Sequence, residues 1–186
     1  MIPHAALREA LRAKRYQRWL TGRDLPRVPK GHCRWCGQPV PPPRRTWCCD
    51  ECVQEYLIRS SNNNVAKQVY QRDKGVCAVC GMDCDWLRAE CRRILRARGS
   101  RSVYESRVDW GPWDTWKSFW DADHIIPVSE GGGCCGLDNY RTLCVACHRR
   151  ETVELARRLA YRRRVKAGCA MQMELQVRQM PWKFDV

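Results

Sequence analysis

The sequence lacks any long apolar segment. No stretch of its 186 residues reaches the uninterrupted run of about 18 apolar residues that a membrane-spanning helix requires. The residues after Met1 also lack the apolar run of a secretory signal, because arginine and lysine are spread through them. These absences argue against a membrane protein and against an oxidising compartment. We therefore expect an intracellular protein, cytoplasmic if its source is a bacterium or phage and nuclear if its source is a eukaryote.

Acidic residues are scarce relative to basic ones. The chain has 20 Asp and Glu residues against 34 Lys and Arg residues, which gives a formal net charge of +14 at pH 7. An excess of this size favours a polyanionic partner such as nucleic acid. A solvated basic surface without a partner is the alternative that charge alone leaves open.

Cysteine, in contrast, is abundant, with 14 residues. In a reducing compartment, cysteine pairs separated by two residues are typical of metal sites, whereas a disulfide-exchange enzyme would use one reactive pair. Each predicted zinc has four thiolate ligands, which are Cys33, Cys36, Cys48 and Cys52 for one ion and Cys77, Cys80, Cys144 and Cys147 for the other. In the first set, Cys49 is an alternative to Cys48. Four thiolates fill a tetrahedral zinc, so we expect both ions to be structural.

Hydrophobic periodicity and turn residues predict several helices. We expect them over 5–20, over parts of 51–74 with a break at 60–64, over 85–98 and over 151–179. The segment 99–118, where tryptophan occurs among glycine and proline, is expected to be a variable insertion. Its tryptophans could stack on unpaired bases, although tryptophan in a small protein more often covers the core.

Histidine is rare, and two of the four histidines fall within one stretch, DADHIIPVSEGGGCCGLDNYRTLCVACHRR, at 121–150. This stretch contains Asp123 and His124, then Asn139, then His148 directly after a cysteine pair. A phosphodiesterase that uses one metal ion needs a base, a metal clamp and a group that fixes the base. All three residue types are present. We expect a short strand at 123–128, a glycine-rich loop and a return toward a helix, which together make a ββα unit.

The four polar residues are given separate roles. We expect Asp123 and His148 to hold one divalent ion through a carboxylate oxygen and an imidazole nitrogen. His124 would point to the other side of the strand and act as the general base, since successive side chains of a strand alternate. Asn139 would orient His124 by hydrogen bonds across the loop. The expected ion is Mg2+, because Asp123 supplies a hard oxygen ligand, with Mn2+ or Ni2+ as alternatives.

Residues 121–152 resemble the HNH endonuclease superfamily, in its zinc-bearing branch with a cysteine pair before the ββα-metal motif and another inside it. More widely, WCCDECVQEYLIRSSNN, GVCAVCGMDC and WDADHIIPVSEGGGCCGLDNYRTLCVACHRRET are similar to the C-terminal nuclease module of animal annealing helicases of the Swi/Snf type. The resemblance implies an α+β, zinc-stapled domain with a ββα-metal core, two four-cysteine zinc sites and basic flanking helices. It also implies metal-dependent cleavage of double-stranded or branched DNA that leaves 3′-hydroxyl and 5′-phosphate ends.

This interpretation divides the chain into parts. They are a basic helical arm at 1–30, a four-cysteine zinc lobe with a connecting helix at 31–74, the nuclease domain at 75–165 and a tail at 166–186. DNA phosphates would be bound after His148 by Arg149, Arg150, Arg157, Arg158, Arg162, Arg163 and Arg164. The arm would add Arg12, Lys14, Arg15 and Arg18.

Two other classes of function remain open. A zinc-dependent nucleic-acid-binding module without turnover would share the charge and the cysteines, but it has no need of Asp123, His124 and His148. A zinc adaptor that binds a protein partner would fold with zinc and show no salt-sensitive affinity for DNA. The sequence does not fix the oligomeric state.

Overall fold

The computed structural model describes residues 4–98 and 118–179. By their internal contacts they form two compact units, Met1–Val145 and Ala146–Val186, and each is described by itself. The predicted insertion at 99–118 lies outside the described residues except for Ser118. None of the described helices is both long enough and apolar enough to cross a membrane.

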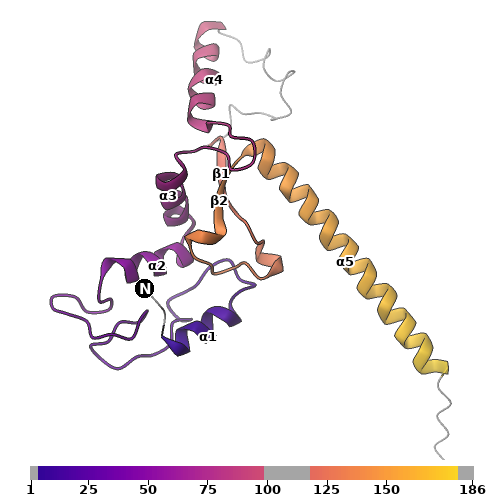
Figure 1. Cartoon of the computed structure of the whole chain (residues 1–186), viewed down its shortest axis with the longest axis horizontal. Coiled ribbons are helices and arrows are strands. Elements are labelled where there is room, and N and C mark those ends of the chain that lie inside the picture. The colour runs from indigo at the N-terminus through magenta and orange to yellow at the C-terminus, as the bar shows by residue number, and fades with distance from the viewer. Residues whose placement is uncertain (1–3, 99–117, 180–186) are drawn as a thin grey trace, which may run out of the picture. The chain divides into compact units, whose positions relative to one another are not determined.

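A two-stranded antiparallel sheet lies at the centre of the first unit (Figure 1). Strand β1 (Trp120–His124) pairs with β2 (Tyr140–Cys144), and His124 lies opposite Tyr140 in the register. The strand expected at 123–128 is therefore wrong in position, because β1 ends at His124. The ladder cannot continue through Pro127, which has no N–H to donate. Two short 3-10 helices, η2 (Val128–Glu130) and η3 (Leu137–Asn139), form part of the connection between the strands.

The helices before the sheet follow the predicted pattern closely. Helices α2 (Asp50–Ser60) and α3 (Asn62–Asp73) are separated at Ser61, within the break expected at 60–64, which is confirmed. Helix α3 buries Val65 and Val69 on one face and packs against both strands (Figure 1). Helix α4 (Cys84–Arg98) confirms the helix expected at 85–98.

The first helix is shorter than the periodicity predicts. Helix α1 (Ala5–Ala13) begins after His4, whose Nδ1 accepts a hydrogen bond from the backbone N–H of Leu7 (3.3 Å). The expected helix at 5–20 is thus wrong beyond Ala13. Residues 15–20 instead bond elsewhere in the chain: the carbonyl of Arg15 accepts from Gly133, and the N–H of Leu20 donates to Arg59 (both 2.6 Å). Tertiary contacts replace the helical hydrogen bonds that local sequence favours.

The last helix, α5, is much longer than the others. It runs over Val145–Gln179, so it begins six residues before the expected start at Glu151. Over residues 149–168 most of its side chains are exposed, and many of them are arginines.

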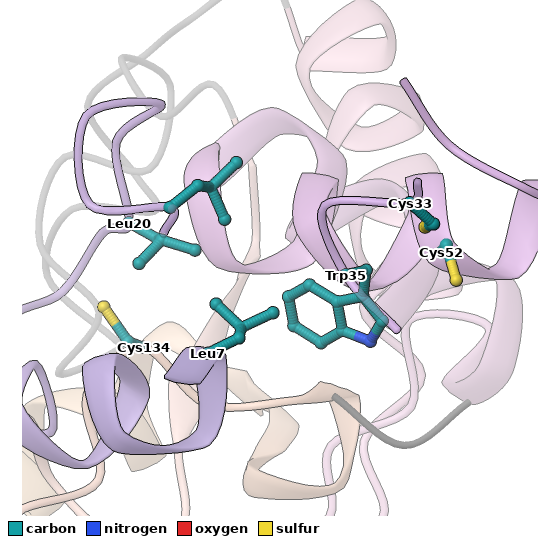
Figure 2. Packing of buried hydrophobic residues seen from close by; sticks show 7 residues of the cluster. Leu7, Leu20, Cys33, Trp35, Cys52 and Cys134 are labelled. Carbon is teal, nitrogen blue, oxygen red and sulfur yellow. The ribbon is translucent and has the colours of Figure 1, made fainter. Parts of the chain in front are cut away.

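The larger hydrophobic core joins the first helix to the cysteine-rich loops. Figure 2 shows Trp35 between two groups of its members, with Leu7, Leu20 and Cys134 on one side and Cys33 and Cys52 on the other. All of these side chains are buried, and Leu7, Trp35 and Cys33 are fully so. A second core cluster contains Ile58, Val65, Val69 and Tyr140. All of these residues belong to the first unit.

Candidate nuclease site

His124 is the last residue of β1 and lies mostly inside the protein. Its side chain is 9% exposed, and its ring packs against that of Tyr140 with a centroid distance of 4.4 Å. The Nε2 atom has no hydrogen-bond partner among the described residues, although it is buried. A buried, unpartnered imidazole nitrogen of this kind is able to accept a proton from a bound molecule.

The surroundings of His124 keep its ring neutral. Burial lowers the pKa of His124 below the usual 6.5, the positive charge of Arg18 lowers it further, and the negative charge of Asp123 opposes both. The neutral imidazole is the form that a general base requires. Arg18 was expected to bind DNA, and its influence on His124 was not predicted.

Asp123 precedes His124 and faces the opposite side of the strand. It lies across from Arg141 in the register, and one Nη of Arg141 is 3.3 Å from a carboxylate oxygen of Asp123. Both side chains are about one-fifth exposed, so the carboxylate is half-buried and accessible. A carboxylate of this kind is a suitable ligand for Mg2+ or Mn2+.

Asn139 fixes the loop that leaves β1 directly after His124. Its Oδ1 accepts from the backbone N–H of Ile126 (2.8 Å), while its Nδ2 donates to the carbonyls of Ile126 (3.1 Å) and Gly132 (3.0 Å). Its own carbonyl accepts from the N–H of Ile125 (2.9 Å). These bonds end on the backbone of the loop. The expected orienting effect of Asn139 on His124 stays a prediction, and it would act through the backbone.

His148 belongs to the second unit, in the first turns of α5. It is half-buried, and its carbonyl accepts a hydrogen bond from the hydroxyl of Thr152 (2.9 Å). The expected sharing of one ion by Asp123 and His148 stays a prediction. So do the expected DNA contacts of Arg149, Arg150, Arg157, Arg158, Arg162, Arg163 and Arg164, all of which have exposed side chains.

The first group of four cysteines has the geometry of a metal site. The ligand atoms of Cys33, Cys36, Cys48 and Cys52 all lie within 4.8 Å of one another. The Sγ atoms of Cys36 and Cys48 are 3.4 Å apart, and those of Cys48 and Cys52 are 3.7 Å apart. A tetrahedral zinc with bonds of about 2.3 Å would separate its sulfurs by about 3.8 Å. The four thiols therefore fit such an ion, and Cys49 is not in the group.

The thiols of this group do not ionise together without a cation. Burial and the thiols of Cys36 and Cys49 raise the pKa of Cys48 to about 12, against a lowering effect of Cys52. Burial also raises the pKa of Cys33, but backbone N–H groups outweigh it and bring that pKa down to about 7. A divalent ion would stabilise all four thiolates at once.

The second group contains Cys77, Cys80, Cys144 and Cys147, whose ligand atoms also lie within 4.8 Å of one another. The Sγ atoms of Cys80 and Cys144 are 3.7 Å apart, close to the separation expected around zinc. Burial raises the pKa of Cys77, but backbone N–H groups, including those of Cys144 and Cys80, lower it to about 6. Both cysteine groups predicted from the spacing could thus hold metal ions.

Comparison with known proteins identifies the segment around His124. Residues 113–154 match the model of the family described as HNH endonuclease. The match includes Asp123, His124, Asn139 and His148. This segment belongs to the HNH endonuclease family. The resemblance drawn from the sequence is therefore confirmed, and the HNH domain has the mixed helix and strand content that was expected.

The relatives of this HNH domain include much longer proteins. The mouse protein named DNA annealing helicase and endonuclease ZRANB3 is 31% identical over 157 residues, which cover 72% of this chain and 14% of the relative. Its cattle counterpart is 34% identical over 137 residues, which cover 63% of this chain and 12% of the relative. The chain thus spans a small part of the curated relatives that it matches.

A solved structure is also similar to the chain. The crystal structure of the human ZRANB3 HNH domain is 29% identical, with a TM-score of 0.40, and the match covers 55% of this chain and 96% of that one.

The glycine run of the HNH domain has a steric role that sequence reasoning missed. A Cβ atom on Gly132 would lie 1.8 Å from the carbonyl oxygen of Ile126, and one on Gly133 would lie 2.1 Å from that of Gln17. Neither position can hold a side chain unless the backbone moves. The signal was present as three consecutive glycines, but nothing in the sequence says which segment approaches them.

Proposed function

We propose that this chain is a metal-dependent DNA endonuclease of the HNH type, with His124 as its general base. One observation carries the proposal: within the segment that matches the HNH family, His124 is buried and its Nε2 atom has no partner among the described residues. The low pKa of His124 supports this role, because the ring stays neutral and able to accept a proton.

The metal would be held by Asp123 and His148. A carboxylate oxygen and an imidazole nitrogen form a donor set that suits Mg2+ or Mn2+ and leaves positions for water and substrate. When bound, the ion would stabilise the negative charge that develops on the phosphate and on the leaving 3′ oxygen.

The chain's own residues would move the proton. Nε2 of His124 accepts a proton from a water molecule whose oxygen then bonds to phosphorus, in line with the bond to the 3′ oxygen. That bond breaks, and the 3′ oxygen takes up a proton from solvent water. The products carry a 3′-hydroxyl and a 5′-phosphate. Asn139 would hold the loop after His124 so that the ring keeps its position.

The two cysteine groups would hold structural zinc. Closed sites of four thiolates leave no position for substrate, so these ions would stabilise the fold and take no part in the chemistry. The ββα-metal arrangement, an intracellular location and action on double-stranded or branched DNA belong to the same proposal.

The test is cleavage of supercoiled plasmid by the purified chain. We expect nicked product with Mg2+ or Mn2+ and no product without a divalent ion. DNA ligase should reseal the nicks, because the ends would be 3′-hydroxyl and 5′-phosphate. Tight, salt-sensitive binding without any nicking, on plasmid and on forked DNA, would instead support the non-catalytic binding module.

A further inference from the structure

We propose that residues 15–20, here called the N-terminal strip, complete the nuclease site by binding substrate phosphates beside His124 through Arg15 and Arg18. The inference rests on the proposed function and adds a part of the chain that lies more than 100 positions away in the sequence.

The strip lies directly against residues 131–133, here called the glycine loop. The N–H of Gly133 donates to the carbonyl of Arg15 (2.6 Å), and a Cβ on Gly133 would lie 2.1 Å from the carbonyl oxygen of Gln17. At Gly131, a Cβ would lie 3.6 Å from side-chain atoms of both Arg15 and Tyr16. Gly133 thus provides room for the strip, because a side chain at this position would collide with the backbone of Arg15 and Gln17.

The same loop is tied to the end of β1. Asn139 donates to the carbonyl of Gly132 and bonds both backbone groups of Ile126, two residues after His124. Hydrogen bonds therefore run from the strip through the glycine loop to the backbone next to the base.

A second set of contacts connects the strip to the core cluster that borders His124. Trp19 packs against the core cluster that contains Tyr140, and the Tyr140 ring lies 4.4 Å from that of His124. Leu20 is 1% exposed, and its N–H donates to the carbonyl of Arg59. The strip is therefore fixed at both ends.

The two arginines of the strip are exposed but held in position. The guanidinium of Arg15 lies 4.9 Å from the centre of the Tyr16 ring, and that of Arg18 lies 5.0 Å from the centre of the Trp19 ring. Arginine binds phosphate oxygens through paired N–H groups, and stacking on a ring orients the guanidinium in advance.

The test compares two double variants that lose the same charge. Arg15→Gln with Arg18→Gln removes both arginines of the strip, whereas Arg23→Gln with Arg27→Gln removes two exposed arginines of the neighbouring segment. We expect the first variant to nick plasmid at least about tenfold more slowly than wild type, since a hydrogen bond to a charged group contributes that much or more. The control should nick at the wild-type rate.

DNA affinity without added Mg2+ provides a readout that does not depend on cleavage. In a plot of log affinity against log salt, the slope should become shallower by about 2 in the strip variant, because each lost phosphate contact removes about 0.9. The Arg15→Lys, Arg18→Lys variant should restore the slope. A wild-type rate and slope in the strip variant would overturn the inference. If the wild type fails to nick any DNA, the proposed function fails, and the slope still decides whether the strip binds phosphate.

Discussion

Arg72 and Asp73 connect the end of α3 to strand β2 and to the residues just before it. Arg72 donates to the carbonyls of Leu137 (2.9 Å) and Tyr140 (2.7 Å). Asp73 accepts from the N–H (3.2 Å) and the hydroxyl (2.9 Å) of Thr142, a fully buried residue. The hydrogen bond with Arg72 lowers the pKa of Asp73, and those with Thr142 lower it further, against the effect of burial. The carboxylate is therefore charged under ordinary conditions.

Removal of this carboxylate is expected to destabilise the protein. Asp73→Ala leaves the two donors of Thr142 buried without a partner, which costs about 1–3 kcal/mol in the free energy of unfolding. Glu90→Ala removes a carboxylate that pairs with Arg93 on the surface of α4, and it should cost less than about 0.5 kcal/mol. Urea unfolding measures both. If Asp73→Ala and Glu90→Ala lower the free energy of unfolding equally, the contacts of Asp73 with Thr142 do not stabilise the fold.

For single residues, the sequence supports a prediction only where the chemistry itself points to a residue type. Asp123, His124, Asn139 and His148 were singled out because few residue types can cleave a phosphodiester and because histidine is rare in this chain, and their roles stay predictions. The structural role of Asp73 was not predicted, since it depends on a hydrogen-bond partner, Thr142, that lies 69 positions away. An aspartate within a helix gives no local sign of such a contact.

Elements were predictable where their signals are local. The cysteine spacing predicted both four-cysteine groups, and the polar residues between α2 and α3 predicted their separation at Ser61. The helix expected at 5–20 failed because residues 15–20 bond the glycine loop and α2 instead. The first strand was misplaced because Asn139 takes up the backbone groups of Ile126 that a longer strand would use.

The second cysteine group is expected to stabilise the elements that it joins. The wild type should contain two zinc ions per chain. Cys80→Ser removes an exposed ligand and should reduce the content to one ion while lowering the unfolding temperature. Cys84→Ser changes a buried cysteine that is outside the group, so zinc content should stay at two. Elemental analysis with thermal unfolding checks both variants, and a full zinc content in Cys80→Ser would contradict this ligand set.

At the scale of the whole molecule, the excess of positive charge predicts electrostatic binding of DNA. The formal net charge is +14, and the exposed arginines of α5 add a long basic surface to the second unit. Contacts of this kind bind the phosphate backbone without reading the sequence of bases. This prediction comes from composition, because it depends on numbers of residues more than on their arrangement.

The affinity for duplex DNA should fall steeply as salt rises. If six or more phosphates are bound, affinity should fall about a thousandfold or more between about 50 and about 200 mM salt. Replacement of Arg162, Arg163 and Arg164 by glutamine should change the slope of log affinity against log salt concentration. The slope should become shallower by about 0.9 for each phosphate contact removed. The control variant replaces the exposed Arg23, Arg27 and Arg45 by glutamine. It loses the same charge, and its slope should stay near that of wild type. A flat salt response of the wild type would contradict the electrostatic account.

The most direct test of the nuclease site is the rate of plasmid nicking by His124→Ala. The control is His32→Ala, which changes a half-buried histidine outside the HNH segment, and zinc content must equal that of wild type in both variants. We predict a loss of at least about a hundredfold for His124→Ala, the contribution typical of a general base, and a wild-type rate for His32→Ala. A zinc-loaded His124→Ala protein that nicks at the wild-type rate would contradict the assignment of His124 as the base.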